Sequence, residues 1–363
     1  MEMILQTLSP VHIGSGDILS PYGDYVFKDG YIYYIDLDKI SEEIYSRPDA
    51  EEIVDSFVEI IKTTADSNQA SKYKLIDFME DNNLDLDMYS KKKVQARETV
   101  NSREIQRIIA TGNRPFIPGS TLKGAIRTSL LYSHLQKEDY DFNQMLRSKS
   151  YTGQYKFGKI QRDVFKHLQV TDTAPLRFDI IDIITTVRWD LVERSDSVPT
   201  PREVIPARTE LKFRLRTTAK KDYDRLKGKF SYLEEDNEKE ILPKINEFYI
   251  EALEKEIKIL RENNPKDFKD IMNFYEGILN EAKELSNKNT GAILRIGAGK
   301  TFYENTVTNC LSDEEQNKII NKVKKGNAKI FPKTRTVVME SDNIYAGPGW
   351  IKISIKEGEV DDS

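Results

Sequence analysis

The sequence is poor in cysteine and histidine. Cys310 is the one cysteine among 363 residues, so no intrachain disulfide can form, which fits a reducing cytoplasm. The three histidines, His12, His134 and His167, are scattered and do not have the spacing of a zinc site. We therefore expect no structural metal and no bound cofactor.

Long apolar segments are also missing. No apolar run reaches the length of about 18 residues that a membrane-spanning helix needs. The N-terminal residues Met1–Leu5 lack the basic segment and the apolar core of a signal peptide. We expect a cytoplasmic protein without a membrane partner.

Positive charge is in deficit overall but is concentrated locally. The net charge is −5, yet nine lysines and arginines and only two acids lie between Lys91 and Arg127. A second basic run between Arg147 and Lys166 holds six bases against Asp163 alone. Such patches allow nucleic-acid binding by a chain that is acidic as a whole. They could equally make the chain a helical scaffold that docks an acidic protein partner.

Hydrophobic periodicity predicts an α+β chain, and its length favours two domains. Residues 38 to about 110 are expected to form a helical insertion, and residues 140 to 165 a loop. Apolar stripes predict two long helices, over residues 240–262 and 266–286. Strands are expected at both ends of the chain, with an early hairpin that turns at Asp29-Gly30: Met3–Leu8, Tyr22–Phe27, Tyr31–Asp36 and Trp350–Lys356.

Charge alternates along one predicted strand. In Leu211–Arg216, apolar residues alternate with Lys and Arg, which predicts one buried and one cationic face. Residues 188–204 lie between extended segments and form either a projecting hairpin or a plain surface loop.

One helix start combines features of a phosphate site. Pro118-Gly119 predicts a turn, and Ser120 is a strong N-cap for a helix over residues 120–135. Lys123 and Arg127 lie four residues apart on one face of this helix. Free backbone N–H groups and two cations suit a phosphate. The alternative is an ordinary capped helix whose Lys and Arg point into water.

Three motifs resemble those of the CRISPR RAMP superfamily. They are IPGSTLKGAIR at Ile117–Arg127, PVHIGSG at Pro10–Gly16, and the glycine-rich RIGAGKT at Arg295–Thr301. The resemblance implies tandem ferredoxin-like (RRM-like) domains. We place the first at residues 1–215, containing the helical insertion, and the second at residues 216–363, containing the glycine-rich loop.

The resemblance also implies a function. Motif order and chain length are most similar to the non-catalytic subunit that caps the type III-A (Csm) effector at the crRNA 3′ end. The implied partners are crRNA, target RNA, a neighbouring RAMP backbone subunit, a small helical subunit and host trimming nucleases. The implied RNA-binding residues lie in the three motifs: His12, Gly14, Gly16, Gly119, Ser120, Lys123, Arg127, Arg295, Gly297, Gly299 and Lys300.

Enzymatic alternatives are limited. Gly299-Lys300-Thr301 is not a P-loop, because Leu294 stands where a Walker A motif needs glycine. No carboxylate group with metal-ligand surroundings stands out. A metal-independent crRNA-processing endoribonuclease remains as an alternative, and His12 is its candidate catalytic residue. The other reading of His12 is a structural histidine that braces the N-terminal loop, and the glycine-rich loop could be a tight turn in the core.

Overall fold

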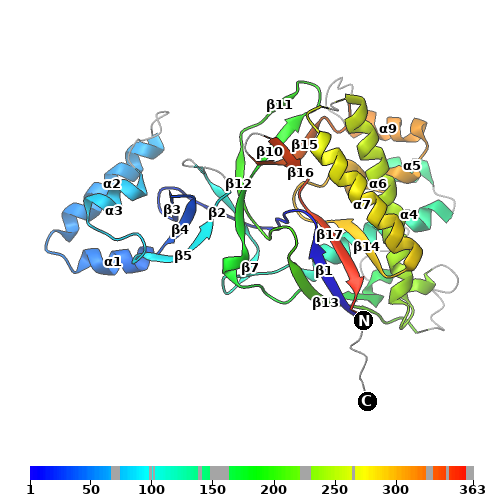
Figure 1. Ribbon diagram of the computed structural model, residues 1–363, viewed down its shortest axis with the longest axis horizontal. Coiled ribbons are helices and arrows are strands. Elements are labelled where there is room, and N and C mark those ends of the chain that lie inside the picture. Colours follow the sequence, from blue (N-terminus) through cyan, green and yellow to red (C-terminus); the bar gives the residue numbers. More distant parts are fainter. Residues whose placement is uncertain are drawn as a thin grey trace, which may run out of the picture.

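The structure is a computed structural model of a mixed α+β protein, in which a small lobe projects from a larger body (Figure 1). No helix in the described part of the chain is long and apolar enough to cross a membrane. The structure describes residues 1–66, 74–97, 100, 103–137, 141–147, 163–220, 230–263, 266–323, 330–340 and 343–356. The acidic C-terminal residues and most of the loop expected at 140–165 lie outside these ranges.

A five-stranded antiparallel sheet forms one half of the body. Its order is β14-β17-β1-β13-β9, and β1, β9 and β14 therefore run in the same direction. Along the chain, β1, α4, β9, β13, α6 and β14 follow a β-α-β-β-α-β order. The late strand β17 inserts between β14 and β1. The strands are β1 (Glu2–Thr7), β9 (Leu168–Val170), β13 (Glu210–Thr217), β14 (Gly291–Arg295) and β17 (Trp350–Ile355).

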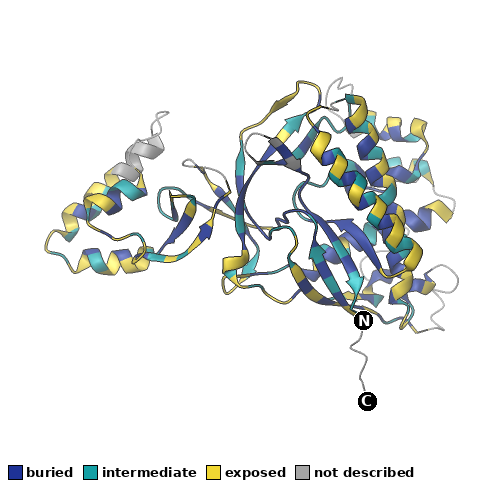
Figure 2. Ribbon diagram, viewed as in Figure 1, coloured by how far each residue is buried: buried dark blue, intermediate teal, exposed yellow. Residues whose placement is uncertain are grey.

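Three helices pack with this sheet and with one another: α4 (Gly119–Lys137), α6 (Ile241–Asn263) and α7 (Lys269–Lys288). The apolar stripes of α6 and α7 are buried as expected, and Figure 2 shows the helices of the body divided into buried and exposed segments. One core cluster contains side chains from Met3 to Ile353. Strands from before and after residue 215 share this sheet, so the two expected domains have a common core here.

A second, seven-stranded sheet forms the other half of the body. Its order is β16-β15-β10-β12-β6-β2, with β11 paired to β10. The pairing of β10 with β11 and β12 shows that residues 188–204 form a hairpin, as one of the two readings expected. The strands are β2 (Gly14–Leu19), β6 (Ile105–Ile108), β10 (Asp182–Asp190), β11 (Ser195–Asp196), β12 (Thr200–Val204), β15 (Thr334–Glu340) and β16 (Asn343–Ala346).

The projecting lobe has its own small core of buried aliphatic and aromatic side chains. Its hairpin turns at Asp29 and Gly30, both with positive φ, as predicted. The helical insertion is shorter than expected, because the helices end at Asp81 and the Lys91–Lys93 run lies in a strand. The elements are β3 (Tyr25–Lys28), β4 (Tyr31–Ile35), β5 (Ser90–Gln95), α1 (Leu37–Tyr45), α2 (Ala50–Asp66) and α3 (Leu75–Asp81).

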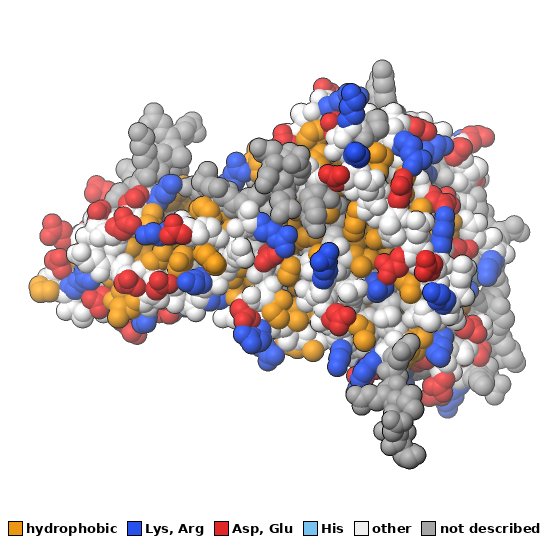
Figure 3. Space-filling view, viewed as in Figure 1, with side chains coloured by type: hydrophobic (Ala, Val, Ile, Leu, Met, Phe, Trp, Pro, Cys, Tyr) orange, Lys and Arg blue, Asp and Glu red, His pale blue; other side chains and the backbone are white. Residues whose placement is uncertain are grey.

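The helices of the lobe carry mostly negative charge. Residues 36–59 contain nine Asp and Glu but only Lys39 and Arg47 as bases. Figure 3 shows red side chains spread over the lobe around an apolar patch. A polyanion would therefore be repelled by these helices and must bind elsewhere.

Short elements complete the described chain. The sequence pattern of Phe165 to Thr171 predicts a strand, but a 3₁₀ turn occupies its first residues and β9 follows. The short strands and α-helices are β7 (Ala110–Thr111), β8 (Arg114–Pro115), α5 (Phe142–Arg147), α8 (Phe302–Asn305) and α9 (Asp313–Val323). The 3₁₀ turns are Val164–His167, Phe178–Ile180, Ser231–Leu233, Glu238–Glu240 and Thr308–Cys310.

Candidate nucleic-acid interface

The three sequence motifs lie at one end of the five-stranded sheet. The His12 loop follows β1, and the glycine-rich loop follows β14. The start of α4 contacts the residues that follow β9, because the Gly119 N–H donates to Asp172 Oδ1 at 2.7 Å. Since β1, β9 and β14 run in the same direction, their carboxyl ends place the three motifs at the same end of the sheet.

The N-terminal loop and the glycine-rich loop contact each other directly. The Ala298 N–H donates to the His12 carbonyl oxygen at 2.9 Å. Gly297 has φ of +67°, and a Cβ added there would lie 2.2 Å from the same oxygen. Only glycine fits this approach, because a side chain would clash and the backbone conformation is strained for other residues.

The His12 side chain is buried and neutral. It is 3% exposed, and Nδ1 lies 2.7 Å from the Glu203 carbonyl oxygen, which fits Nδ1–H as the donor. Burial lowers the pKa of His12 to about 4. The side chain therefore braces the loop, as the structural reading of His12 expected.

Glu203 ties this region to the lobe. Its side chain is 1% exposed, and its carboxylate accepts hydrogen bonds from the Tyr34 hydroxyl at 2.6 Å and from the Ile108 N–H at 2.8 Å. These two hydrogen bonds link β12 to β4 and to β6. The lobe is thereby anchored next to the His12 loop.

Gly14 and Gly16 lie at the start of β2, next to the His12 loop, and are exposed. Gly16 has φ of +95°, and an added Cβ would meet no atom within 4 Å. Glycine is therefore favoured here by the backbone conformation and not by lack of space. A Cβ on Gly14 would lie 3.2 Å from His12 Nε2. The backbone of this segment is accessible to a ligand.

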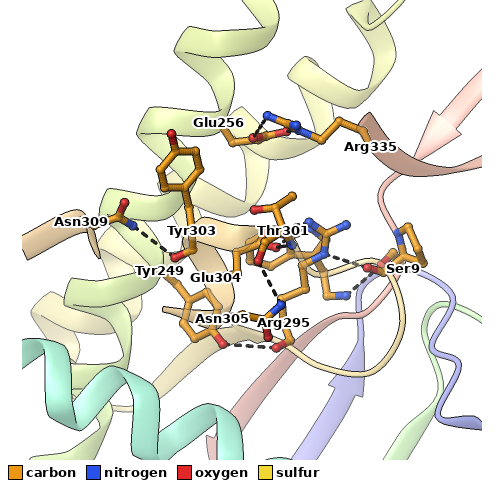
Figure 4. A network of polar contacts seen from close by, with 12 residues as sticks. Ser9, Tyr249, Glu256, Arg295, Thr301, Tyr303, Glu304, Asn305, Asn309 and Arg335 are labelled. Carbon is orange, nitrogen blue, oxygen red and sulfur yellow. Dashed lines mark hydrogen bonds and ion pairs between the residues drawn. The ribbon is translucent and has the colours of Figure 1, made fainter. Parts of the chain in front are cut away.

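Arg295 is in the interior and not on an RNA-facing lip, which corrects its expected role. Its side chain is 2% exposed, and Nη1 lies 2.8 and 3.0 Å from the two carboxylate oxygens of Glu304 (Figure 4). Nε donates to the Pro348 carbonyl at 2.8 Å. Burial lowers the pKa of Arg295, but Glu304, Tyr275 and Glu256 together raise it by more, so the guanidinium stays charged.

Glu304 also holds the glycine-rich loop in place. Its Oε2 accepts the Thr301 N–H at 2.6 Å, in a capping box at the start of α8. A second buried ion pair, between Glu256 and Arg335, lies nearby in Figure 4. The buried Arg295–Glu304 ion pair and the Thr301 hydrogen bond therefore fix both ends of the glycine-rich loop.

Lys300 points to a separate cavity. This cavity has a volume of about 260 Å³ and is lined by Arg188, Lys300 and threonine side chains, among others. Arg188 Nη2 donates to Thr334 Oγ1 at 3.1 Å. Burial lowers the pKa of Lys300, and nearby Glu304 opposes this shift. Gly299, with φ of +101°, forms part of the wall. Two cations and several hydroxyls make this cavity suited to an anion.

The start of α4 differs from the expected phosphate site. The helix begins at Gly119, one residue before the expected cap, and Ser120 is an exposed residue of its first turn. The Pro118 carbonyl accepts from Thr121 and Leu122 N–H groups. The anion at this helix start is Asp172, a residue of the protein itself, and it satisfies the electrostatic preference of the N-terminus.

The two cations of α4 are also engaged within the protein. Lys123 Nζ donates to the Leu168 carbonyl at 2.7 Å, and burial lowers its pKa. Arg127 forms an ion pair with Asp163 and lies over the Phe165 ring, 4.9 Å from its centroid. These contacts fix α4 against the segment before and within β9. These contacts favour a positioning role for Lys123 and Arg127 over the expected role as phosphate ligands.

The sequence reading missed several partners. Asp163 and Asp172 lie far along the chain from α4, and no local pattern marks them as its partners. Arg188 was missed because the strand β10 that carries it reads as apolar. The Thr301-x-x-Glu304 spacing, by contrast, is a recognisable capping box. No group of histidine, cysteine and acidic residues that could hold a metal occurs among the residues that the structure covers.

Comparisons with known proteins agree with this architecture. A curated relative named "CRISPR system Cms protein Csm5", from Methanocaldococcus jannaschii, is 26% identical over 391 residues, covering 98% of this chain and 89% of its own. A protein of the same name from Streptococcus thermophilus is 27% identical over 237 residues, covering 60% of this chain and 64% of its own.

Solved structures show the same fold. One chain of a Csm-crRNA-target RNA ternary complex of a type III-A CRISPR-Cas system superposes with a TM-score of 0.70 at 20% identity, covering 97% of this chain and 100% of that chain. A crystal structure of T. onnurineus Csm5 superposes with a TM-score of 0.67 at 18% identity, covering 96% and 99%. The family model described as the RAMP superfamily matches residues 4–302. Because this match spans most of the chain, the protein belongs to the RAMP superfamily.

Proposed function

We propose that this protein is a non-catalytic crRNA-binding subunit of a type III-A CRISPR ribonucleoprotein. It caps the backbone filament at the crRNA 3′ end and contributes to crRNA maturation and antiviral defence. Two curated relatives carry the name Csm5, and one structural neighbour belongs to a complex with crRNA and target RNA, which supports this role. The partners would be crRNA, target RNA, a neighbouring RAMP subunit and a small helical subunit.

The observation that carries the proposal is the pairing of the two glycine loops beside a cationic cavity. The exposed backbone at Gly14 and Gly16 lies next to the loop of Gly297 and Gly299, and Lys300 and Arg188 line the cavity beyond it. Exposed glycine backbone together with cations fits the phosphate oxygens of an RNA strand. Phosphate contacts of this kind position RNA without reading its sequence.

Binding is favoured over catalysis by the state of His12. A pKa of about 4 keeps its imidazole neutral at physiological pH, so it has no proton to give as a general acid. Its Nδ1 is held by a backbone carbonyl, and the ring is buried. The competing function, a metal-independent endoribonuclease, would need this ring to be reached by RNA.

The test is a binding and cleavage assay on purified protein with labelled crRNA in the presence of EDTA. We expect binding without cleavage. Replacing Arg188 and Lys300 with alanine should lower the slope of log K against log salt by about 1.4, or 0.7 per lost phosphate contact. Lys283→Ala with Lys288→Ala, on the exposed face of α7, removes the same charge and should leave the slope unchanged. Cleavage that disappears in His12→Ala would instead establish the endoribonuclease.

A further inference from the structure

The cationic face of β13 is the feature that the proposed site leaves unexplained. Along this strand, exposed and buried residues alternate without exception from Glu210 to Thr217, as the sequence pattern predicted. Lys212, Arg214 and Arg216 all lie on the exposed side, about 6.7 Å from one to the next. Figure 1 shows β13 beside β1 at one end of the body.

These cations are mostly free of partners inside the protein. Within the residues that the structure describes, Lys212 and Arg214 make no ion pair and no side-chain hydrogen bond. Arg216 has only a surface contact of 3.5 Å with Glu235, which contributes little stability. In contrast, Lys123 and Arg127, which the sequence favoured as ligands, are both engaged internally. Clustered like charges without partners repel one another, and an external anion would relieve this repulsion.

The acids next to these cations do not neutralise them. Glu2 faces Arg214 across the sheet, and its carboxylate is paired with Lys356 at 3.0 Å; Lys356 lowers the pKa of Glu2 most, and Lys212 and Arg214 contribute less. Lys352 of the same sheet is paired with Glu281 of α7 at 2.9 Å. Glu210 lies at the start of the strand, opposite Gln6. The ridge formed by Lys212, Arg214 and Arg216 therefore keeps its positive charge.

The chemistry of this face fits a nucleic-acid backbone better than a protein. On β1, β9 and β17 the solvent-accessible positions of this face are polar or charged except for half-buried Ile4, and none is aromatic: Glu2, Ile4, Gln6, Gln169, Lys352 and Ser354, besides those of β13. Trp350 and, on β14, Ile293 share the face but are fully buried. Protein interfaces usually have an apolar or aromatic centre, which is missing here. Base stacking also needs aromatic rings, so only the sugar-phosphate chain would be contacted.

We propose that the ridge of Lys212, Arg214 and Arg216 is a sequence-independent contact for the backbone of single-stranded RNA. The proposal rests on the proposed function, because RNA held at the glycine loops would be the strand that reaches this ridge. β13 begins beside the carboxyl end of β1, where those loops lie, since Glu210 pairs with Gln6. The ridge then leads away from the loops along the length of β13.

The test compares three charge-neutralised proteins on long oligouridine and on long oligoadenosine. The ridge variant carries Lys212→Gln, Arg214→Gln and Arg216→Gln, all at exposed positions where the fold is not at risk. The matched control carries Lys269→Gln, Lys283→Gln and Lys288→Gln on α7. The third protein carries Arg188→Ala and Lys300→Ala in the cavity.

We expect the ridge variant to lower the salt slope by about 2, equally on both RNAs, and the control to leave it unchanged. An unchanged slope in the ridge variant, with native circular dichroism, would overturn the proposal and leave the face to an acidic protein partner. An equal decrease in the control, or an effect on one RNA only, would overturn it as well. Normal RNA binding by the cavity variant would refute only the glycine-loop site, because the ridge is tested by a different variant.

Discussion

The carbonyl oxygen of His12 accepts a hydrogen bond from the Ala298 N–H at 2.9 Å, although the two residues lie near opposite ends of the chain. This contact joins two loops with related sequences, Ile13-Gly-Ser-Gly16 and Ile296-Gly-Ala-Gly299. It makes the backbone of both loops, and not the imidazole of His12, the feature on which the site depends. The predictions below follow from this contact and from the ion pairs that surround it.

Gly297→Ala should destabilise the protein by roughly 1–3 kcal/mol, because the new Cβ meets the His12 carbonyl and the residue keeps a positive φ. Urea denaturation measures the change. Gly16→Ala is the matched control, since Gly16 also has a positive φ but has open space around it, and its cost should be smaller. Equal costs for both variants would show that the loop contact does not constrain Gly297.

Glu304→Gln should cost roughly 3–5 kcal/mol of folding free energy, because it leaves the buried guanidinium of Arg295 without its counter-charge. Chemical denaturation provides the measurement. Glu314→Gln, which breaks a surface pair with Lys318, should change stability by less than about 1 kcal/mol. If Glu304→Gln lost RNA binding at full stability, Arg295 would have to be restored as an RNA ligand.

Stability should fall as pH drops from about 7 to 4, in part because of His12. The pKa of His12 is near 6.5 in the unfolded chain and about 4 in the fold, so the unfolded state takes up a proton in this range that the folded state does not. The effect is at most about 3 kcal/mol. His12→Asn, whose amide can replace Nδ1–H, should reduce this pH dependence relative to the wild type. An identical pH profile for the two proteins would contradict the buried, neutral state of His12.

Lys123→Ala with Arg127→Ala should lower the melting temperature, because the bonds to the Leu168 carbonyl and to Asp163 that hold α4 are lost. The salt slope of RNA binding should stay unchanged, since neither side chain would be contacting phosphate. Differential scanning calorimetry and a salt titration make the two measurements. A decrease in slope of about 1.4 with an unaltered melting temperature would restore the phosphate assignment.

Local sequence patterns predicted the parts of the fold that depend on periodicity. The stripes of α6 and α7, the Asp29-Gly30 turn and the alternation along β13 were all read from neighbouring residues. The Lys91–Lys93 run was misread because lysine has no strong strand signal, and its place in β5 depends on pairing with β4. Sheet order was equally out of reach, since it is decided by contacts between distant segments.

The candidate site shows the same division. The motif drew attention to Gly297, but its contact with the His12 carbonyl oxygen could be seen only in the fold. The partners of Arg295, Lys123 and Arg127 could not be predicted from the sequence. A cation has the same sequence pattern whether it contacts Glu304, Asp163 or a phosphate. Only the folded arrangement distinguishes an internal ion pair from an exposed ligand. The ridge on β13 was visible as a pattern, but that its cations are unpaired required the structure.

The insertion of β17 between β14 and β1 has a consequence for synthesis. A ribosome releases β1 at the start and β17 only after residue 355, so throughout translation β1 and β14 lack the neighbour that joins them. Both then present open strand edges, which invite pairing with other chains. A nascent chain of this protein cannot close its main sheet before β17 has emerged, and a product truncated ahead of Trp350 would be a substrate for chaperones or proteases.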